Sequence, residues 1–349
     1  MTELRQLTAA RGIAAWLVVL YHVRGSIAGL AHGVEAIFAK GYLAVDSFFL
    51  LSGFVIWLSW HERLRDGGMA EVPRFLQKRI ARIWPLHAAM LAFAAVLAVA
   101  LAVSERSDPA FPIAELPLHL LLVQNWGLTD ALAWNDPAWS ISCELAAYLA
   151  FPLLVTAVDW RRVPTAGLIA VAGMLLLALY AVMAGQPNLG ADIPRFGLVR
   201  CLAEFATGTI VAALWLRGVG RHAWIIGIAA LTAALLGTPE ALVVPAGFAA
   251  MLLALAHRPR AFNTRSLHWL GEISYATYLS HFLLWKAFKL AFVTDADRVA
   301  PVTILAYLAL VLAASALLYH GLERPAQRWV NRLGPVRQAP RRPLPSAHR

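Results

Sequence analysis

Residues 164–184 read PTAGLIAVAGMLLLALYAVMA and contain no charged side chain. A helix needs about 20 apolar residues to cross the hydrocarbon core of a bilayer, which is about 30 Å thick. Similar runs recur along the chain, and hydrophobic residues make up 60% of its 349 residues. Charged residues make up only 14%, against about 25% in a typical soluble domain. The sequence therefore predicts an integral membrane protein.

These runs predict an all-α fold, a polytopic bundle of about ten transmembrane helices. The spans are expected near residues 8–25, 42–60, 83–103, 138–158, 164–184, 198–216, 223–237, 241–256, 269–292 and 301–320. The seventh and eighth are short and nearly adjacent, so they form either a tight helical hairpin or one broken element. A basic, Pro-rich tail over residues 326–349 is expected to be disordered, which leaves one membrane domain over residues 1–325.

The distribution of Lys and Arg predicts that both chain ends lie in the cytoplasm. With the N-terminus inside, 22 of the 30 Lys and Arg residues fall on the inner side, as expected if basic residues accumulate in cytoplasmic loops. The same bias accounts for the net charge of +10 without a nucleic-acid partner. Cys143 and Cys201 lie in apolar surroundings without a CxxC spacing, so we expect neither a disulfide framework nor a metal site.

Two ionisable residues of the first span, Arg11 and His22, are eleven positions apart. Eleven steps of about 100° bring the second side chain to within about 20° of the first, after a rise of about 16 Å. Both side chains therefore share one helix face, as an anion clamp and a deeper titratable base would. Alternatively, Arg11 extends to the interface and His22 only hydrogen-bonds a neighbouring helix. A charge at mid-depth costs about 2.5–3.5 kcal/mol, which indicates a task or a partner.

Three further spans carry polar residues that need partners in a membrane. Asp46, near the start of the second span, either accepts the ring N–H of a histidine or caps its helix at the interface. Glu144 follows Ser140 by four residues, so both lie on one helix face. Tyr278 and His281 also share a face, and they either bind a polar substrate or close a network between helices.

The loop before the third span is densely basic, with Arg74, Lys78, Arg79 and Arg82 ahead of Pro85. One interpretation is topology, since basic residues hold a loop in the cytoplasm. The other is a binding site for a phosphorylated cytoplasmic ligand, because Arg recognises phosphate through bidentate hydrogen bonds.

Taken in order, these segments resemble the acyltransferase-3 family of bacterial membrane acyltransferases, from about residue 3 to residue 326. The resemblance rests on seven motifs: Arg11 with His22; GYLAVDSFFLLSGF (41–54), with Ala44 where Gly is usual; Arg79, Arg82 and Pro85; WSISCE (139–144), with Ile141 for Leu; Arg200, Phe205 and Gly208; SYATYLSH (274–281); and Glu323 with Pro325. Each motif alone is weak, whereas seven in order across ten spans are specific.

The resemblance implies a single-domain, multi-pass acyltransferase of the bacterial inner membrane, without the SGNH-type esterase domain that can be fused to it. It implies transfer of an acyl group, usually acetyl, from cytoplasmic acyl-CoA to a sugar hydroxyl. Acyl-CoA, with acetyl-CoA as the usual form, is then a co-substrate, and no bound cofactor is expected. The acceptor is expected to be a cell-surface polysaccharide, a lipid-linked oligosaccharide or a glycosylated metabolite.

Roles for individual residues follow as hypotheses. Donor binding is assigned to Arg11, Lys78, Arg79 and Arg82. Catalysis is assigned to His22, as a general base or a covalent acyl relay, with Asp46 or Glu144 fixing its tautomer. Acceptor binding is assigned to Trp139, Ser140, Arg200, Tyr278 and His281. The alternative is a non-enzymatic transporter, since ionisable residues in spans also suit solute pathways, although no inverted repeat is evident.

Overall fold

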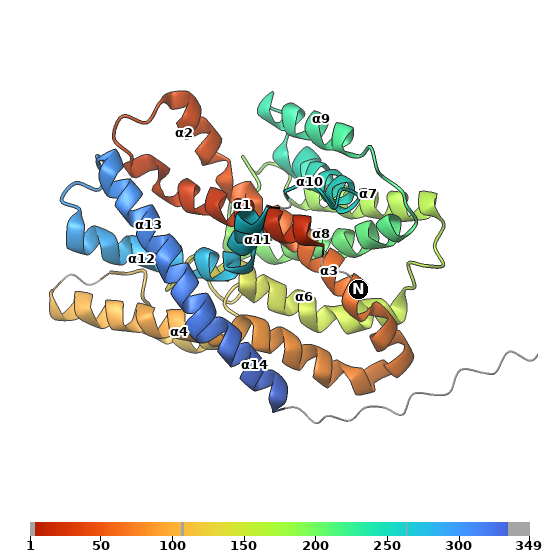
Figure 1. Cartoon of the computed structure of the whole chain (residues 1–349), viewed down its shortest axis with the longest axis horizontal. Coiled ribbons are helices and arrows are strands. Elements are labelled where there is room, and N and C mark those ends of the chain that lie inside the picture. Colours follow the sequence, from red (N-terminus) through yellow and green to blue (C-terminus); the bar gives the residue numbers. More distant parts are fainter. Residues whose placement is uncertain (1–3, 106–107, 263, 334–349) are drawn as a thin grey trace, which may run out of the picture.

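The computed structural model describes residues 4–105, 108–262 and 264–333, and within these ranges the chain folds into α-helices joined by loops (Figure 1). The extended pairing found there is one β-bridge between Ile27 and Val299. Helices suit so apolar a chain, because in a bilayer only a helix satisfies its backbone hydrogen bonds within its own segment. The all-α prediction is confirmed.

Each predicted span coincides with a helix. The helices are α1 (Arg5–Val23), α2 (His32–Ala39), α3 (Ala44–Gly67), α4 (Val72–Val103), α5 (Leu116–Leu121), α6 (Ala138–Ala157), α7 (Thr165–Val182), α8 (Ile193–Leu216), α9 (Trp224–Leu235), α10 (Glu240–Ala256), α11 (Arg265–Glu272), α12 (Ser274–Phe292), α13 (Pro301–Leu318) and α14 (Arg324–Arg332). The span expected at 269–292 is divided at Ile273 into α11 and α12.

Five helical segments of the described chain are long and apolar enough to cross a membrane: 32–103, α6, α7, α8 and 301–332. The count of about ten spans stays a prediction. Part of the reason is that α9 and α10 have only 12 and 17 residues, or about 18 Å and 25 Å at 1.5 Å per residue.

The short helices α9 and α10 form a hairpin and not one broken element. Gly227 of α9 lies against Met251 of α10, and Ala230 lies against Gly247, so the two helices run antiparallel. The chain therefore comes back through α10 to the end of the bundle at which α9 begins. The directions of α12 and α13 follow from this.

Contacts between helix ends divide the bundle into two ends. One end, which we call the arginine-rich end, joins Arg65 to Asp159, Arg217 to Val163 and Gln77 to Val330. The opposite end joins Lys40 to Glu240, Ala28 to Val299 and Lys286 to Asp108. The long helices alternate in direction between these ends. That the arginine-rich end faces the cytoplasm stays a prediction.

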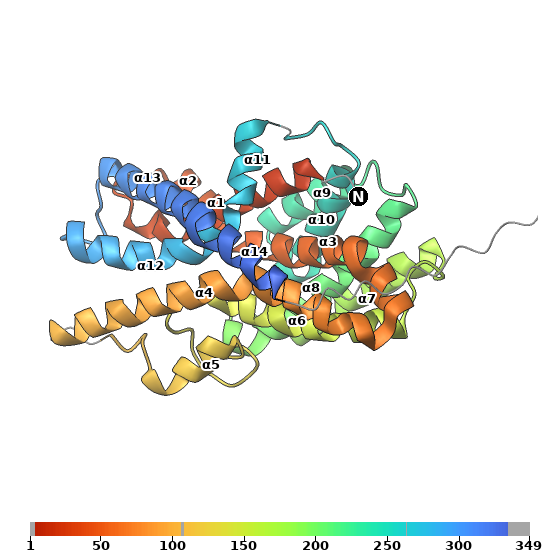
Figure 2. The same ribbon diagram turned by 60° about the horizontal axis from the view of Figure 1, so that its bottom comes forward.

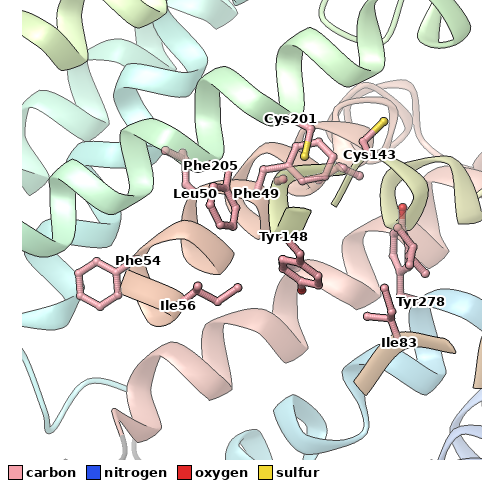
Figure 3. Close-up of a cluster of buried hydrophobic side chains, with 14 of the residues drawn as sticks. Phe49, Leu50, Phe54, Ile56, Ile83, Cys143, Tyr148, Cys201, Phe205 and Tyr278 are labelled. Atoms are coloured by element: carbon pink, nitrogen blue, oxygen red, sulfur yellow. The ribbon is translucent and has the colours of Figure 1, made fainter. Parts of the chain in front are cut away.

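Glycines bring helix backbones into direct contact at two crossings. A Cβ atom on Gly12 of α1 would lie 2.7 Å from the backbone nitrogen of Gly271 in α11, so no larger residue fits. Gly53 of α3 touches the backbone of α8, and Gly208 of α8 touches that of α3. Small residues at such crossings are typical of membrane helices. Buried aromatic side chains fill the space beside the second crossing, among them Phe49, Tyr148 and Phe205 (Figure 3).

The C-terminal part of the chain differs from expectation. After α13, a π-helical turn at Tyr319–Glu323 leads into α14, which crosses α4 (Figures 1 and 2). Gln77 of α4 donates a hydrogen bond to the carbonyl of Val330 at 2.7 Å. Residues 326–332 are therefore helical and docked, and the prediction that they belong to a disordered tail is wrong. Residues 334–349 lie outside the described ranges.

Candidate active site

A cavity of about 350 Å³ lies among α1, α3, α4, α6 and α12. Its polar lining comes from five helices, and Arg79 and Arg82, predicted to lie in a loop, belong to α4, which begins at Val72. The polar residues are Thr8, Arg11, Ser52, Arg79, Arg82, Ser140, Glu144, Tyr148, Ser274, Tyr275 and Tyr278. We call it the arginine cavity, because three guanidinium groups line it. Arg11, Arg79 and Arg82 were predicted to act together, and the structure brings them together.

Two of the three arginines are held by the surrounding helices. Arg11 donates from Nε to Ser274 Oγ at 2.9 Å and from Nη2 to the Gly271 carbonyl at 2.8 Å. Its partners are neutral, so its positive charge is not cancelled. Arg82 forms an ion pair with the buried carboxylate of Glu323, in the turn before α14. The charge of Arg82 is therefore balanced within the protein.

Arg79 differs from both. It lies over the rings of Tyr148 and Phe75, with centroid distances of 5.9 and 6.0 Å. It makes no hydrogen bond or ion pair with any residue that the structure describes, and its Nε atom is buried. A guanidinium group has five N–H donors in a planar fork that matches phosphate or carboxylate. Among the hydrogen-bond donors in the cavity, the Arg79 guanidinium group is therefore the one best placed to bind an anionic ligand.

Glu144 lies on the wall of the same cavity. Its Oε1 atom accepts hydrogen bonds from Ser52 Oγ and from Tyr148 OH, the latter at 2.5 Å. It does not contact His22, so the prediction that Glu144 could fix the His22 tautomer is not supported by this geometry. Sequence reasoning also missed Ser52 and Tyr148, although Tyr148 could have been found by its spacing of four residues from Glu144 on one helix face.

Asp46 and Arg200 form a closed ion pair between α3 and α8. Arg200 Nε and Nη2 donate to the two carboxylate oxygens of Asp46 at 2.6 Å each, and Nη1 donates to the Leu189 carbonyl at 2.9 Å. The exposed fractions are 0% for Asp46 and 1% for Arg200. Asp46 therefore does not orient His22, and Arg200 is not accessible to an acceptor. Both predicted roles are corrected to a structural one.

His22 has a histidine partner instead of a carboxylate. Its Nδ1 atom lies 3.1 Å from Nε2 of His281 and 2.9 Å from the Val18 carbonyl. The Phe282 ring meets the His22 ring edge-on at 5.5 Å. His281 is fully buried, so its predicted contact with an acceptor is corrected to a contact with His22.

The hydrogen bonds of this histidine pair determine where the protons lie. His281 Nδ1 faces the Thr277 carbonyl at 3.1 Å, and a carbonyl only accepts, so a neutral His281 carries its proton on Nδ1 and leaves Nε2 bare. His22 Nδ1 then faces two acceptors, that bare Nε2 and the Val18 carbonyl, and it must be the protonated nitrogen. His22 Nε2 keeps its lone pair and makes no hydrogen bond to any described residue. It can act as a base or as a nucleophile.

The arginine cavity and the histidine pair lie along the same two helices. Arg11 and His22 both point toward α12, where Arg11 contacts Ser274 and His22 contacts His281. This confirms that the two residues share one face of α1. Tyr278 connects the two regions. Its hydroxyl group is 2.8 Å from Ser140 Oγ in the cavity wall, and its ring centroid is 6.2 Å from that of His281.

Two predicted binding residues lie outside the cavity lining. Trp139 is buried between Phe49 and the Arg200 guanidinium, at centroid distances of 5.8 and 5.7 Å, so its predicted acceptor role is corrected to packing. Lys78 does not line the cavity, so the predicted donor set is reduced to its arginines. Among the described residues, no group of three or more His, Cys, Asp or Glu side chains is placed to hold a metal ion.

Comparisons with known proteins bear on this arrangement. The family model described as an acyltransferase domain matches residues 4–320. The chain is 31% identical to the acyltransferase MdmB of Streptomyces mycarofaciens, over 97% of this chain and 96% of that protein. It is 27% identical to the exopolysaccharide production protein ExoZ of Rhizobium meliloti (strain 1021), over 83% of this chain and 91% of that protein. No solved structure matches the chain.

Proposed function

This chain belongs to the acyltransferase family whose domain matches residues 4–320, and from that premise we propose that it moves an acyl group from acyl-CoA to a hydroxyl group of a carbohydrate or glycoconjugate. As an acyltransferase, it transfers groups other than aminoacyl groups. One observation carries the proposal: α1 and α12 together hold the uncancelled guanidinium group of Arg11 at one depth and a histidine with a free Nε2 at another.

The donor occupies the arginine cavity in this proposal. Coenzyme A carries phosphate groups, and Arg79 and Arg11 offer guanidinium groups that no carboxylate of the described chain neutralises. Acetyl-CoA is the donor we expect. The pantetheine arm then runs from the arginines past Tyr278 toward His22, along a helical rise of about 16 Å between residues 11 and 22.

The chemistry takes place at His22 Nε2. As a general base, this nitrogen accepts the proton of the acceptor hydroxyl while the hydroxyl oxygen bonds to the thioester carbonyl carbon. The carbon–sulfur bond then breaks, and the thiolate of coenzyme A takes the proton from the imidazolium. As a relay, Nε2 itself attacks the thioester carbonyl carbon and the carbon–sulfur bond breaks, which gives an acyl-imidazolium and the thiolate of coenzyme A. The acceptor hydroxyl then attacks the acyl carbon, the bond to Nε2 breaks, and the hydroxyl proton is balanced by protonation of the thiolate. Both routes use the same free nitrogen.

The acceptor class is supported by the name of one relative. That relative is an exopolysaccharide production protein, and from this we propose a sugar hydroxyl as the acceptor. We also propose that the protein lies in a bacterial inner membrane with both chain ends in the cytoplasm, so that the arginine cavity opens toward cytoplasmic acyl-CoA. The excess of Lys and Arg on that side supports this orientation.

The proposal is tested with membranes that contain the full chain. They are given radiolabelled acetyl-CoA and a panel of methyl glycosides, and the readouts are free thiol and labelled glycoside. We expect thiol release that depends on a glycoside and is lost in His22→Ala. Labelled protein that forms without acceptor and disappears in His22→Ala identifies the relay. Uptake of solute without thiol release would instead identify a transporter and overturn the proposal.

A further inference from the structure

A second cavity, of about 750 Å³, opens between α1 and α3 on one side and α9 and α10 on the other. It extends from Lys40 and Gly41 at one end to Arg258 and Phe262 at the arginine-rich end. The lining between these ends is mostly apolar and includes Ile13, Leu17, Val244, Phe248 and Leu255, with Arg11 and Ser47 as polar members. We call it the lateral groove. It shares Leu7, Arg11 and Leu51 with the arginine cavity.

A buried N–H donor and an exposed guanidinium group, neither with an acceptor in the described chain, lie together at the arginine-rich end of the lateral groove. The Trp224 indole Nε1 is buried and makes no hydrogen bond to any described residue. The Arg258 guanidinium lies 5.7 Å from the centroid of the Trp224 ring, and no carboxylate in the described ranges pairs with it. Buried N–H groups nearly always have a partner, and a guanidinium with an adjacent N–H is a site for an anionic oxygen.

The remainder of the groove excludes water as its occupant. Water does not fill a cavity lined by Ile, Leu, Val and Phe, and leaving so large a cavity empty is costly, because the cost grows with cavity volume. The occupant therefore has an apolar chain. The two N–H donors indicate that the occupant also carries an oxyanion at one end. That end lies where α10 finishes and the chain reaches the membrane interface.

We propose that the lateral groove binds one membrane phospholipid. Its phosphate group accepts hydrogen bonds from Arg258 and the Trp224 N–H, and one acyl chain lies along α1 and α10. The two N–H donors of this site are separate from the residues proposed to bind acyl-CoA, since neither Arg258 nor Trp224 lines the arginine cavity. The bound chain would support Leu7 and Leu51 from behind, on the wall that the two cavities share.

The experiment measures the thermal unfolding temperature of the delipidated full chain in detergent, with three additives. Phosphatidylglycerol supplies both phosphate and chains, diacylglycerol only chains, and inorganic phosphate only the anion. We expect phosphatidylglycerol alone to raise the unfolding temperature, by about 3 °C or more, and to remain bound in native mass spectrometry. An equal effect of diacylglycerol or of inorganic phosphate would overturn the proposal.

Two conservative variants locate the site. Arg258→Gln removes the charge, and Trp224→Phe removes only the N–H while keeping an aromatic ring. Both should lose most of the phosphatidylglycerol effect and the retained lipid, whereas Arg260→Gln, a neighbouring exposed residue outside the groove lining, should keep both. Ala14→Phe fills the groove from the α1 side and should abolish lipid retention even with both donors intact. Unchanged retention in Arg258→Gln and Trp224→Phe would show that the lipid binds elsewhere.

Discussion

Arg200 and Arg79 are both arginines of membrane helices, yet they have opposite surroundings. All three guanidinium nitrogens of Arg200 are matched, because Asp46 accepts from two of them and the Leu189 carbonyl accepts from the third. Arg79 lies against aromatic rings and has no acceptor in the described chain. The difference indicates that a fully paired arginine stabilises the fold, whereas an unpaired one in a cavity is available to a ligand.

The same distinction applies to the histidine pair. Three of its four ring nitrogens take part in hydrogen bonds within the protein, and His22 Nε2 remains free. Removing that nitrogen, in His22→Ala, is expected to give the largest functional effect, a loss of about 10²- to 10⁴-fold in kcat, the usual contribution of general acid–base catalysis. Initial rates of thiol release measure this loss.

The control for His22→Ala is His32→Ala, which changes an exposed histidine of α2 outside the arginine cavity and the histidine pair. It should retain its rate. Both variants should insert into membranes like the unchanged protein, and retained activity in His22→Ala would remove His22 from the mechanism.

Arg200→Met tests the structural side of the comparison. It leaves the Asp46 carboxylate buried without a partner, and we expect a loss of about 3–5 kcal/mol in the free energy of unfolding. Thermal unfolding in detergent measures the loss. The double variant Arg200→Met, Asp46→Leu should recover most of it, because removing both charges together is far less costly than removing one. If Arg200→Met were as stable as the unchanged protein, the ion pair would not have the role assigned to it.

Arg79→Gln tests the ligand-binding side. Loss of one charge-assisted hydrogen bond costs about 1.5–3 kcal/mol, so the KM for acetyl-CoA should rise at least about tenfold, while the unfolding temperature stays unchanged. The adjacent Lys78→Gln, outside the cavity, should leave both values unchanged. Arg82→Gln should lower the unfolding temperature, since it leaves Glu323 buried and unpaired. An unaltered KM in Arg79→Gln would refute the donor role of Arg79.

The smallest effect is expected at His281. In His281→Leu, the His22 ring loses one acceptor for its Nδ1–H, and kcat should fall about tenfold, the value of one neutral hydrogen bond, with little change in KM. His281→Gln can present an amide oxygen near the same place and should restore part of the rate. Equal rates in the Leu and Gln variants would show that His281 contributes shape and not a hydrogen bond.

Much of the fold could be predicted because apolar runs mark the long helices, whereas α2, α5 and α14 carry no such run. The convergence of Arg11, Arg79 and Arg82 could also be predicted, since each lies near one end of its helix and on the same predicted side of the membrane. Pairing could not. Asp46 and Arg200 are 154 residues apart, and they meet because Gly53 and Gly208 let α3 and α8 touch.

Residues of the same type that look alike in the sequence have different roles, and only their neighbours in the folded structure distinguish them. The pattern treats Arg79 and Arg82 alike, but Glu323 at the far end of the chain neutralises only Arg82. The pattern likewise assigns His281 to the acceptor, because i, i+4 and i+7 spacing indicates a shared face and not the helix that the face meets. That face meets α1, and His281 therefore lies against His22.

The contact between Gly12 and Gly271 has a mechanical consequence. With no side chain between the two backbones, α1 and α11 cannot approach any closer, and a rotation of either helix would bring a larger residue into the contact. Any opening that admits acyl-CoA must therefore move these two helices as one rigid body, together with Arg11, which donates to the Gly271 carbonyl.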